Sequence, residues 1–333
     1  MATRVAVDAM GGDRAPTVVV EGAVRAVQEN AQRVEIILVG VEDEVNVELQ
    51  KAGGSDLPIS VMNAAEVIDM GESPSAALKS KPDSSIHVGI GAHKQGLVDA
   101  FVSAGNTGAV MAAGVFICGR LPGVHRPSLP GYFPTPDGTS IVLDVGANVD
   151  VRPEHLVQFA HMGAIFAREA FGVSKPSVAL LNVGEEPGKG TEAVKEAYST
   201  LESEQTIRFI GNVEGRDLFA HKADVVVCDG FVGNALLKLG ESFASILPQM
   251  IKKEIGKQKL GADEATLVGR VIQGALTPFN YENFGGVPLL GVDGNVLIGH
   301  GGSTALAIEQ MIYRACDIVE QQVTTKIAQA LAE

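Results

Sequence analysis

Five short segments of this sequence combine glycine with small polar residues just after an apolar run. Glycine permits tight turns, and a tight turn that leads into a helix presents unpaired backbone N–H groups and the positive end of the helix dipole. Such groups bind anions, above all phosphate. Any one segment is more often just a turn, so the prediction of an anion site rests on all five together. The segments are DAMGGD at 8–13, SAGNTG at 103–108, DVGANVD at 144–150, NVGEEPGKG at 182–190 and DGFVGN at 229–234.

Several side chains in or near these segments have types that could do chemistry. Lys189 lies in a glycine-flanked loop, where it is either a solvated surface lysine or a cation that reaches a phosphate or a developing oxyanion. Asp8, Asp144 and Asp229 end apolar runs, where a carboxylate is costly unless it caps a helix or serves a site. His300 precedes another glycine-rich turn and is either a buried, hydrogen-bonded histidine or a catalytic one. The sequence leaves both interpretations open in each case.

The elements that must position these segments alternate along the chain. Short apolar runs predict strands, and most are separated by segments such as 153–171, whose three- and four-residue apolar spacing predicts helices. This alternation predicts an α/β fold of three α/β/α layers with a mostly parallel sheet, in a single catalytic domain over residues 1–333. Ligands of such sheets bind at the carboxyl ends of the strands, so the five segments should converge there. The predicted strands are 5–8, 34–39, 59–62, 100–103, 141–144, 177–182, 207–211 and 225–229.

Two stretches depart from the alternation. Residues 241–285 contain no convincing strand and predict two helices, joined near 256–261, that project from the sheet as a hairpin. Residues 121–138, rich in proline and glycine, form the longest expected loop, whose length suits the border of a site. Four lysines flank the apolar stripe of the first hairpin helix, and they suit an acidic partner, anionic lipid or plain solvation: Lys252, Lys253, Lys257 and Lys259.

The bulk composition narrows the classes of function. The 333 residues carry a net charge of −14, which argues against nucleic-acid binding, because such proteins need basic surface to displace counterions. Mean hydropathy of +0.18 indicates a sizeable core, yet no segment has the length of a membrane span, so a cytoplasmic location is expected. No P-loop, dinucleotide, zinc-protease or nucleophile-elbow motif is complete. Without such a motif we expect no cofactor. We also expect no metal site, since the cysteines are isolated and lack metal-type spacing: Cys118, Cys228 and Cys316.

Seven stretches, in chain order, carry a resemblance to the phosphate acyltransferase (PlsX) family of bacterial phospholipid synthesis, and the C-terminal helical part also fits. Two departures from the family pattern occur. Arg14 stands where the family usually has His, and Gly302 and Thr304 replace the Ser and Asp of a C-terminal HGSSD, which puts an essential role for those two positions in doubt. The matching stretches are VAVDAMGGD at 5–13, SAGNTGA at 103–109, LDVGANVD at 143–150, PEHLVQFA at 153–160, LLNVGEE with KG at 180–190, FIGNVEGRD at 209–217 and DVVVCDGFVGN at 224–234.

This resemblance implies a homodimeric enzyme that moves a long acyl chain from acyl carrier protein to inorganic phosphate. The acyl phosphate would serve phospholipid synthesis, with a glycerol-3-phosphate acyltransferase as a possible downstream partner. The implied fold is similar to that of the isocitrate and isopropylmalate dehydrogenase group. The family associates peripherally with the inner face of the cytoplasmic membrane, so the 241–285 hairpin would supply the dimer contact and the lipid-touching tip, with Ile251, Ile255, Leu260 and Leu267.

The implied reaction gives the candidate residues their expected roles. Lys189 and Asn234 would polarise the thioester carbonyl or orient the phosphate, and Asp229 or His300 could take a proton. No covalent enzyme intermediate is needed, because phosphate at neutral pH already carries a nucleophilic oxygen. The residues expected to bind phosphate or pantetheine are Asp8, Gly11, Gly12, Ser103, Gly105, Asn106, Thr107, Asp144, Gly146, Asn148, Asn182, Gly184 and Gly233.

Two alternatives remain at this stage. A dehydrogenase on the same fold would need clustered acidic metal ligands or a nicotinamide site, and the sequence supplies neither pattern. A noncatalytic membrane-associated scaffold would bind acyl carrier protein without phosphate-dependent loss of the thioester. Formation of acyl phosphate without a nicotinamide cofactor would separate the enzyme from both.

Overall fold

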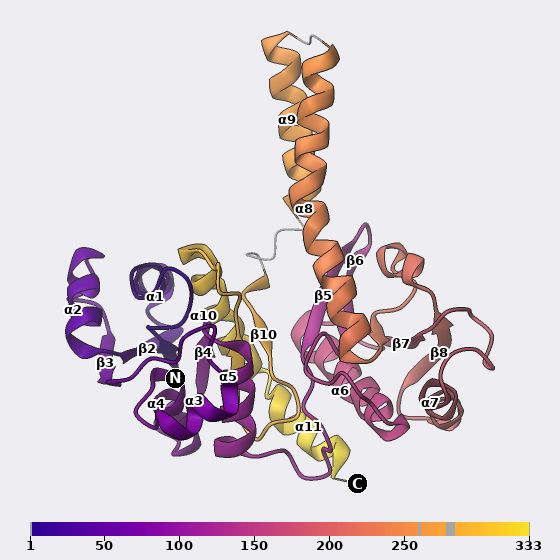
Figure 1. Cartoon of the computed structure of the whole chain (residues 1–333), viewed down its shortest axis with the longest axis horizontal. Helices are drawn as coiled ribbons and strands as arrows, with labels where there is room; N and C mark the ends of the chain where they lie inside the picture. The colour runs from indigo at the N-terminus through magenta and orange to yellow at the C-terminus, as the bar shows by residue number, and fades with distance from the viewer. Residues whose placement is uncertain (1, 259–260, 278–283, 333) are drawn as a thin grey trace.

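The computed structural model describes residues 2–258, 261–277 and 284–332. Two helix-covered sheets lie side by side, and a long helical hairpin projects away from them (Figure 1). Most strand pairs are parallel, so the predicted α/β class is confirmed, with the strands divided between two sheets. The predicted single catalytic domain stays a prediction.

The first sheet contains the N-terminal strands and two strands from the C-terminal part of the chain. Its order is β10-β11-β4-β1-β2-β3, and in the described residues only β10 runs antiparallel to its neighbour. Its elements are β1 (Thr3–Asp8), α1 (Thr17–Asn30), β2 (Val34–Gly40), α2 (Glu42–Lys51), β3 (Ile59–Asn63), α3 (Pro74–Ser80), α4 (Ser85–Lys94), β4 (Ala100–Ser103), α5 (Thr107–Ala113), the π-helical turn η1 (Gly114–Cys118), β10 (Val287–Pro288), β11 (Val296–Ile298), α10 (Ala305–Glu320) and α11 (Val323–Leu331).

The second sheet is built from the middle of the chain. Its order is β5-β6-β9-β7-β8, and the edge strand β5 pairs antiparallel with β6. Its elements are β5 (Pro130–Thr135), β6 (Gly138–Leu143), α6 (Pro153–Phe171), β7 (Ser177–Leu181), α7 (Glu192–Ser203), β8 (Arg208–Val213), the 3₁₀ helix η2 (Gly215–Ala220) and β9 (Val225–Val227).

The apolar core runs across both sheets. One cluster of buried side chains contains Val5 of the first sheet and Val178 of the second, and another contains Ala6 and Val226. Helix α1 packs closely on α10, where a Cβ on Gly22 would lie 2.6 Å from Cβ of Ile308. Helix α11, from the C-terminal end, packs on α6 beside the second sheet. The two sheets are therefore held together by shared packing, and their facing edges form a fixed seam.

The hairpin consists of α8 (Gly230–Gln258) and α9 (Ala262–Leu276), which confirms the two predicted helices. Ile251 and Ile255 line a groove between them together with Ile272, whereas Leu267 is 55% exposed. Leu260 lies outside the described residues. Within the described residues, no helix is long and apolar enough to cross a membrane.

Three strands are absent from the sequence prediction. Strand β5 lies inside the stretch 121–138. This stretch was expected to be a loop because Pro130, Gly131 and Pro134, all within the strand, hide its alternation. As an edge strand it tolerates proline, since one side of its backbone forms no ladder. Strands β10 and β11 contain only two and three residues, too few for a periodic pattern.

Candidate active site

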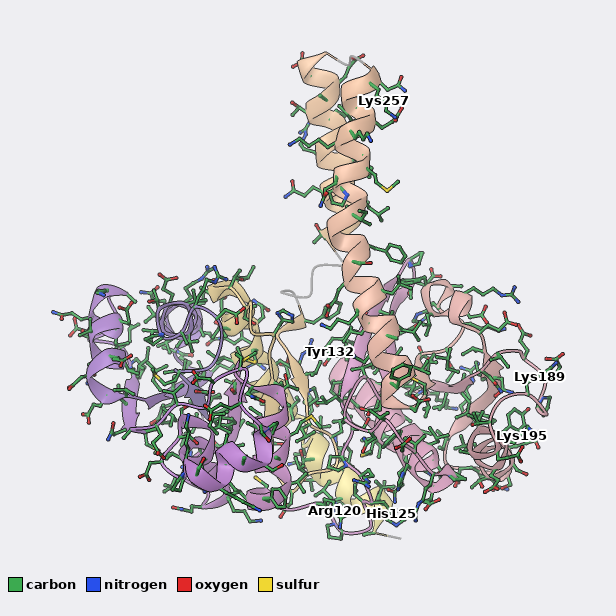
Figure 2. All side chains as sticks on the ribbon, viewed as in Figure 1. Arg120, His125, Tyr132, Lys189, Lys195 and Lys257 are labelled. Carbon is green, nitrogen blue, oxygen red and sulfur yellow. The ribbon has the colours of Figure 1, made fainter. Side chains whose placement is uncertain are left out.

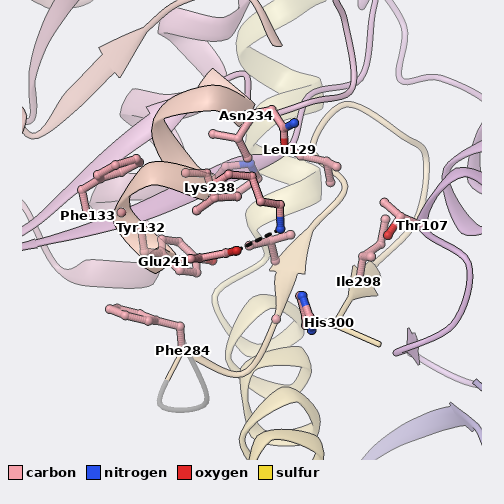
Figure 3. A pocket seen from close by; sticks show the side chains of 18 of the residues that line it. Thr107, Leu129, Tyr132, Phe133, Asn234, Lys238, Glu241, Phe284, Ile298 and His300 are labelled. Atoms are coloured by element: carbon pink, nitrogen blue, oxygen red, sulfur yellow. Dashed lines mark hydrogen bonds and ion pairs between the residues drawn. The ribbon is translucent and has the colours of Figure 1, made fainter. Parts of the chain in front are cut away.

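A cavity of about 330 Å³ lies at the seam between the two sheets, beside the base of the hairpin (Figure 3). Most of its lining is apolar or aromatic, and both sheets contribute. From the first sheet come Thr107 of α5, Ile298 of β11 and the loop at His300, and from the second come β5, Val145 and the first turns of α8. Aromatic side chains form one wall: Tyr132, Phe133, Phe219 and Phe284.

Few polar groups reach this cavity. Asn234, predicted from the sequence, lines it from α8, and Thr107 and His300 line it from the opposite side (Figure 3). Lys238 and Glu241, which sequence reasoning missed, also line it and form an ion pair with a Nζ–Oε2 distance of 2.9 Å. The carboxylate thus compensates the lysine charge within the same helix.

Tyr132 adds a second polar group that the sequence did not reveal, because its strand was taken for a loop. Its ring contacts that of Phe284 at a tilt of 33°, with centroids 5.0 Å apart. The buried hydroxyl has no hydrogen-bond partner among the described residues, and burial raises its pKa. The hydroxyl therefore stays protonated and can donate.

The ends of β1 and β4 meet in a closed network around Asp8. Ser103 Oγ donates to Asp8 Oδ2 at 2.6 Å and accepts the N–H of Gly105 at 3.0 Å. A Cβ on Gly11 would lie 2.4 Å from the same carboxylate oxygen. Burial raises the pKa of Asp8, and the Ser103 hydrogen bond opposes that rise. Glycine is required here for the two loops to approach each other, and protein atoms fill the space predicted for an anion.

Asn106 caps α5, the helix that follows the end of β4. Its Oδ1 accepts the N–H of Ala109 at 3.0 Å, and its Nδ2 donates to the carbonyls of Asp69, Met70 and Glu72. Both ends of the amide therefore have structural partners. Thr107, the next residue, is exposed and lines the cavity.

The end of β6 forms a second closed network. Asp144 is fully buried, and its carboxylate accepts from the backbone of Leu129 at 2.9 Å, from the backbone and side chain of Asn148, and from the hydroxyl of Ser128. Burial raises the pKa of Asp144, against these hydrogen bonds. The carbonyl of Asp144 would lie 1.8 Å from a Cβ on Gly233, so the start of α8 requires glycine there.

Gly146 connects this second corner to the cavity. Its φ of +126° favours glycine, and a Cβ on it would lie 3.7 Å from the side chain of Asn234. Asp229, at the end of β9, accepts the N–H of Val232 at 2.9 Å and so caps α8. The capping interpretation is confirmed for Asp229, which does not line the described cavity.

The loop after β7 lies apart from the two hydrogen-bonded networks around Asp8 and Asp144. Asn182 Nδ2 donates to the carbonyl of Lys189 at 3.0 Å, and a Cβ on Gly184 would lie 3.3 Å from the Lys189 side chain. Lys189 is exposed on the outer side of the second sheet, far from Tyr132 of the cavity (Figure 2). The structure therefore brings four of the five predicted segments to the seam and leaves the fifth outside it.

The two departures from the family pattern contact each other. Arg14 Nη2 donates to the carbonyls of Gly302 at 3.3 Å and Ser303 at 2.9 Å, and the carbonyl of Gly301 would lie 3.2 Å from a Cβ on Gly12. Thr304 caps α10 by accepting the N–H of Ala307. Arg14 thus fixes the loop that carries His300.

One group of side chains has the spacing of metal ligands. His125, Glu154 and His155 offer ligand atoms within 4.8 Å of one another. However, His155 Nδ1 accepts the backbone N–H of Arg152 at 3.1 Å, which places the ring proton on Nε2 in the neutral form. The cluster also lies among Arg120, Arg126 and Arg152, whose charges repel a cation. These residues do not fit a metal ion.

Comparisons with known proteins identify the family. A family model described as "Fatty acid synthesis protein" matches residues 3–326. Phosphate acyltransferase of Salinibacter ruber is 51% identical over 333 residues, covering 100% of this chain and 97% of that protein, and phosphate acyltransferase of Chlorobaculum parvum is 49% identical, covering 98% of each. A solved phosphotransacetylase of Streptococcus pyogenes has the same fold, with a TM-score of 0.63 over 96% of this chain and 94% of that one at 18% identity. The chain therefore belongs to the phosphate acyltransferase family, and it is an acyltransferase.

Proposed function

We propose that this acyltransferase moves a long-chain acyl group from acyl carrier protein to inorganic phosphate, and that the acyl phosphate serves phospholipid synthesis. The observation that carries this proposal is the apolar cavity at the seam, which only a few polar groups reach. Aromatic and aliphatic walls suit an acyl chain, while Asn234, Thr107 and His300 suit the carbonyl and the phosphate. A glycerol-3-phosphate acyltransferase would consume the product.

The reaction requires positioning and charge stabilisation. A phosphate oxygen attacks the thioester carbon, the new C–O bond forms as the C–S bond breaks, and the sulfur leaves as a thiolate that takes up a proton. Between the attack of the phosphate oxygen and the departure of the thiolate, the carbonyl oxygen carries negative charge. Asn234 Nδ2 can donate to that oxygen, and one preorganised donor of this kind is typically worth ~3 kcal/mol of barrier. The reaction needs no cofactor.

His300 is proposed as a donor. Its Nδ1 accepts the backbone N–H of Gly302 at 3.1 Å, so the neutral ring carries its proton on Nε2. A donor at Nε2 stabilises negative charge on the oxyanion or protonates the leaving thiolate. Arg14 holds the carbonyls of the same loop and thereby fixes the orientation of the ring.

Catalytic roles for Lys189 and Asp229 have less structural support than those for Asn234 and His300. Asp229 serves as the cap of α8, a role that positions Asn234 one turn further along the helix. Lys189 could contribute only if its loop came to the seam, because the structure places it on the outer side of the second sheet (Figure 2). A catalytic role for Lys189 stays a prediction that its variant tests.

The hairpin is proposed to contact a second copy of the chain and the inner face of the cytoplasmic membrane. Four large apolar side chains on its two helices are more than half exposed besides Leu267: Phe231, Leu239, Met250 and Val271. Exposed apolar side chains of this number on a projecting element mark a contact surface. Lys252, Lys253 and Lys257 are exposed beside them and suit anionic headgroups.

The test is phosphate-dependent formation of acyl phosphate from acylated carrier protein, trapped with hydroxylamine. Asn234→Ala should lower kcat/KM roughly a hundredfold, as expected for loss of one oxyanion donor. Asn30→Ala, at the exposed end of α1, is the matched control and should keep the wild-type rate. Wild-type activity in Asn234→Ala, or wild-type enzyme that releases no acyl phosphate, would overturn the proposal. Lys189→Ala is measured alongside to decide whether its loop takes part.

A further inference from the structure

A second cavity, of about 810 Å³, adjoins the apolar one along the seam. Neighbouring residues line the two cavities in turn: Thr107 the first and Gly108 the second, Val145 the first and Ala147 the second, Val287 the first and Leu289 the second. The second cavity lies on the side of the molecule away from the hairpin, where Figure 2 shows Arg120 and His125. One cleft thus has an apolar part and a part of different character.

The charge of the second cavity is entirely positive. Among the described residues that line it, Arg120 and Arg126 are the charged side chains, and no carboxylate accompanies them. This contrasts with the net charge of −14 on the whole chain. A further cavity of about 510 Å³ shares Arg120, His125 and Arg126, and Arg152, Asp150 and Glu154 line it as well. Two guanidinium groups without a carboxylate between them favour an anionic ligand.

The arginines project from a firmly held loop. Arg120 donates to the carbonyl of His125, and the N–H of His125 donates to Gln158 Oε1 at 2.9 Å. Gln158 Nε2 donates in turn to the carbonyl of Gly123 at 2.7 Å, and the N–H of Leu121 donates to the carbonyl of Gly291 at 3.0 Å. Helix α6 and the chain before β11 therefore fix the loop on both sides, and little ordering is required when a ligand binds.

The arginine side chains differ in the hydrogen bonds and ion pairs that they already form. Arg126 is exposed and forms no hydrogen bond or ion pair with a described residue, and Arg152 approaches Glu154 only to 3.8 Å. Burial lowers the pKa of His155, the charge of Glu154 opposes that shift, and the charges of Arg126 and Arg152 add to it. An anion that bound between the arginines would meet donors whose hydrogen-bonding capacity is largely unused.

We infer that Arg120 and Arg126 form a binding site for a phosphate oxyanion at the mouth of the cleft, contributed either by inorganic phosphate or by the phosphodiester of a pantetheine arm. The identity of the substrate rests on the proposed function, whereas the oxyanion site rests on the cavity and its arginines. Guanidinium groups bind phosphate oxygens with two parallel N–H donors, which fixes orientation as well as charge. The apolar cavity then receives the acyl chain from the other side of the junction.

The first experiment measures binding without turnover. If inorganic phosphate occupies the site, calorimetric titration with sodium phosphate should give a Kd at least tenfold higher for the double variant Arg120→Gln/Arg126→Gln than for the wild-type enzyme, and Arg126→Lys should fall between them. Arg208→Gln, an exposed arginine at the start of β8, is the control and should bind as wild type. Wild-type binding should weaken with ionic strength more than binding by the double variant. Thermal unfolding verifies that each variant is folded.

The second experiment separates the two sources of the oxyanion. If inorganic phosphate occupies the site, the KM for phosphate rises with the Kd. If the phosphodiester does, phosphate binding is unchanged, the KM for acyl carrier protein rises tenfold, and an acyl-pantetheine donor without phosphate is used equally by wild type and Arg126→Gln. Either result supports the site, and a double variant equal to Arg208→Gln in every constant overturns it. If wild-type enzyme binds phosphate through these arginines but forms no acyl phosphate, the site stands and the proposed function fails.

Discussion

The two cavities of the cleft differ in how the charged side chains that line them are paired. In the apolar cavity beside the hairpin, the cation of Lys238 is paired with Glu241 on the same helix. In the cavity on the other side, Arg120 and Arg126 are the charged lining residues, and the carboxylates of Asp150 and Glu154 line the neighbouring cavity that shares these arginines. Arg126 forms no ion pair with a described residue, so its charge is available to an anionic ligand, whereas the charge of Lys238 is already compensated.

The loops at the junction of the two cavities are structural. Asp8 and Asp144 each accept several hydrogen bonds from the loops around them, and these loops hold Thr107, Val145 and Asn234 in place. The carboxylates therefore act by positioning. The difference between the cavities can be tested with substitutions at Asp8 and Asp144, at the junction, and with substitutions in the lining of each cavity.

The largest effect is expected from Asp144→Asn. The substitution puts an N–H₂ group where two or more donors now point at carboxylate oxygens, and a mismatched buried network of this kind costs about 3 kcal/mol of unfolding free energy. Urea denaturation measures the loss. Asp137→Asn, an exposed aspartate in the turn before β6, should change stability by less than about 0.5 kcal/mol. Equal stability of the two variants would contradict the structural role of Asp144.

A charge in the apolar cavity should impair long-chain donors selectively. Leu237→Glu places a carboxylate in the lining of the apolar cavity, beside Glu241, and kcat/KM for a long-chain donor should fall about tenfold, or about 1.4 kcal/mol. A two-carbon donor should lose less than about threefold, since it leaves the apolar wall unoccupied. Leu97→Glu, at an exposed leucine outside the cleft, is the control. Equal loss with both donors would show that the cavity does not hold the acyl chain.

Titration of Asp8 should appear in the pH dependence of stability. Burial raises its folded pKa above the usual 3.8, so its contribution is fully present below pH 3.8 and is lost as pH rises through the folded pKa. The unfolding free energy of Asp8→Asn minus that of wild type should therefore increase with pH, by at most about 1.4 kcal/mol per pH unit. Denaturation series at several pH values measure the slope. A flat difference would mean that burial does not raise the pKa of Asp8.

The smallest effect is expected from Lys238→Gln. The Lys238–Glu241 pair lies on a helix with the lysine exposed, so its loss should change the unfolding free energy by less than about 0.5 kcal/mol. The Kd for phosphate should stay within about twofold of wild type, because the charge is already compensated. Weakening of phosphate binding as large as in Arg120→Gln/Arg126→Gln would move the oxyanion site into the apolar cavity.

Much of the fold could be predicted from the sequence, because buried parallel strands and amphipathic helices carry local periodic patterns. The predicted strands near Val5, Ala100 and Val225 and the two hairpin helices are all present. Strand β5 escaped because an edge strand accepts proline, and with it the aromatic wall at Tyr132 and Phe133 was missed. Glu241 is the first residue of the hairpin predicted for dimerisation, Lys238 precedes that hairpin, and nothing in their spacing indicates that they line a cavity.

The candidate site depends on pairings that no local pattern encodes. Arg120 and Arg126 belong to a proline- and glycine-rich loop that was expected only to border a site, and their juxtaposition across the seam from Gly108 arises from packing between the two sheets. Likewise, the glycines near Asp8 and Asp144 looked like an anion cradle in sequence, whereas they are required for close approach of protein atoms. Glycine suits both an anion cradle and the close approach of protein atoms, so its presence in the sequence does not distinguish the two.

The sequence by itself determined most of the strands, the two hairpin helices and the family, because periodicity and ordered motifs are properties of neighbouring residues. Only the tertiary structure decided which loops meet, that Lys189 lies outside the seam, that Glu241 compensates Lys238 in the apolar cavity, and that two arginines line the adjoining one. Electrostatic and steric interactions act through space over a few ångströms, so they depend on contacts between residues far apart in the chain.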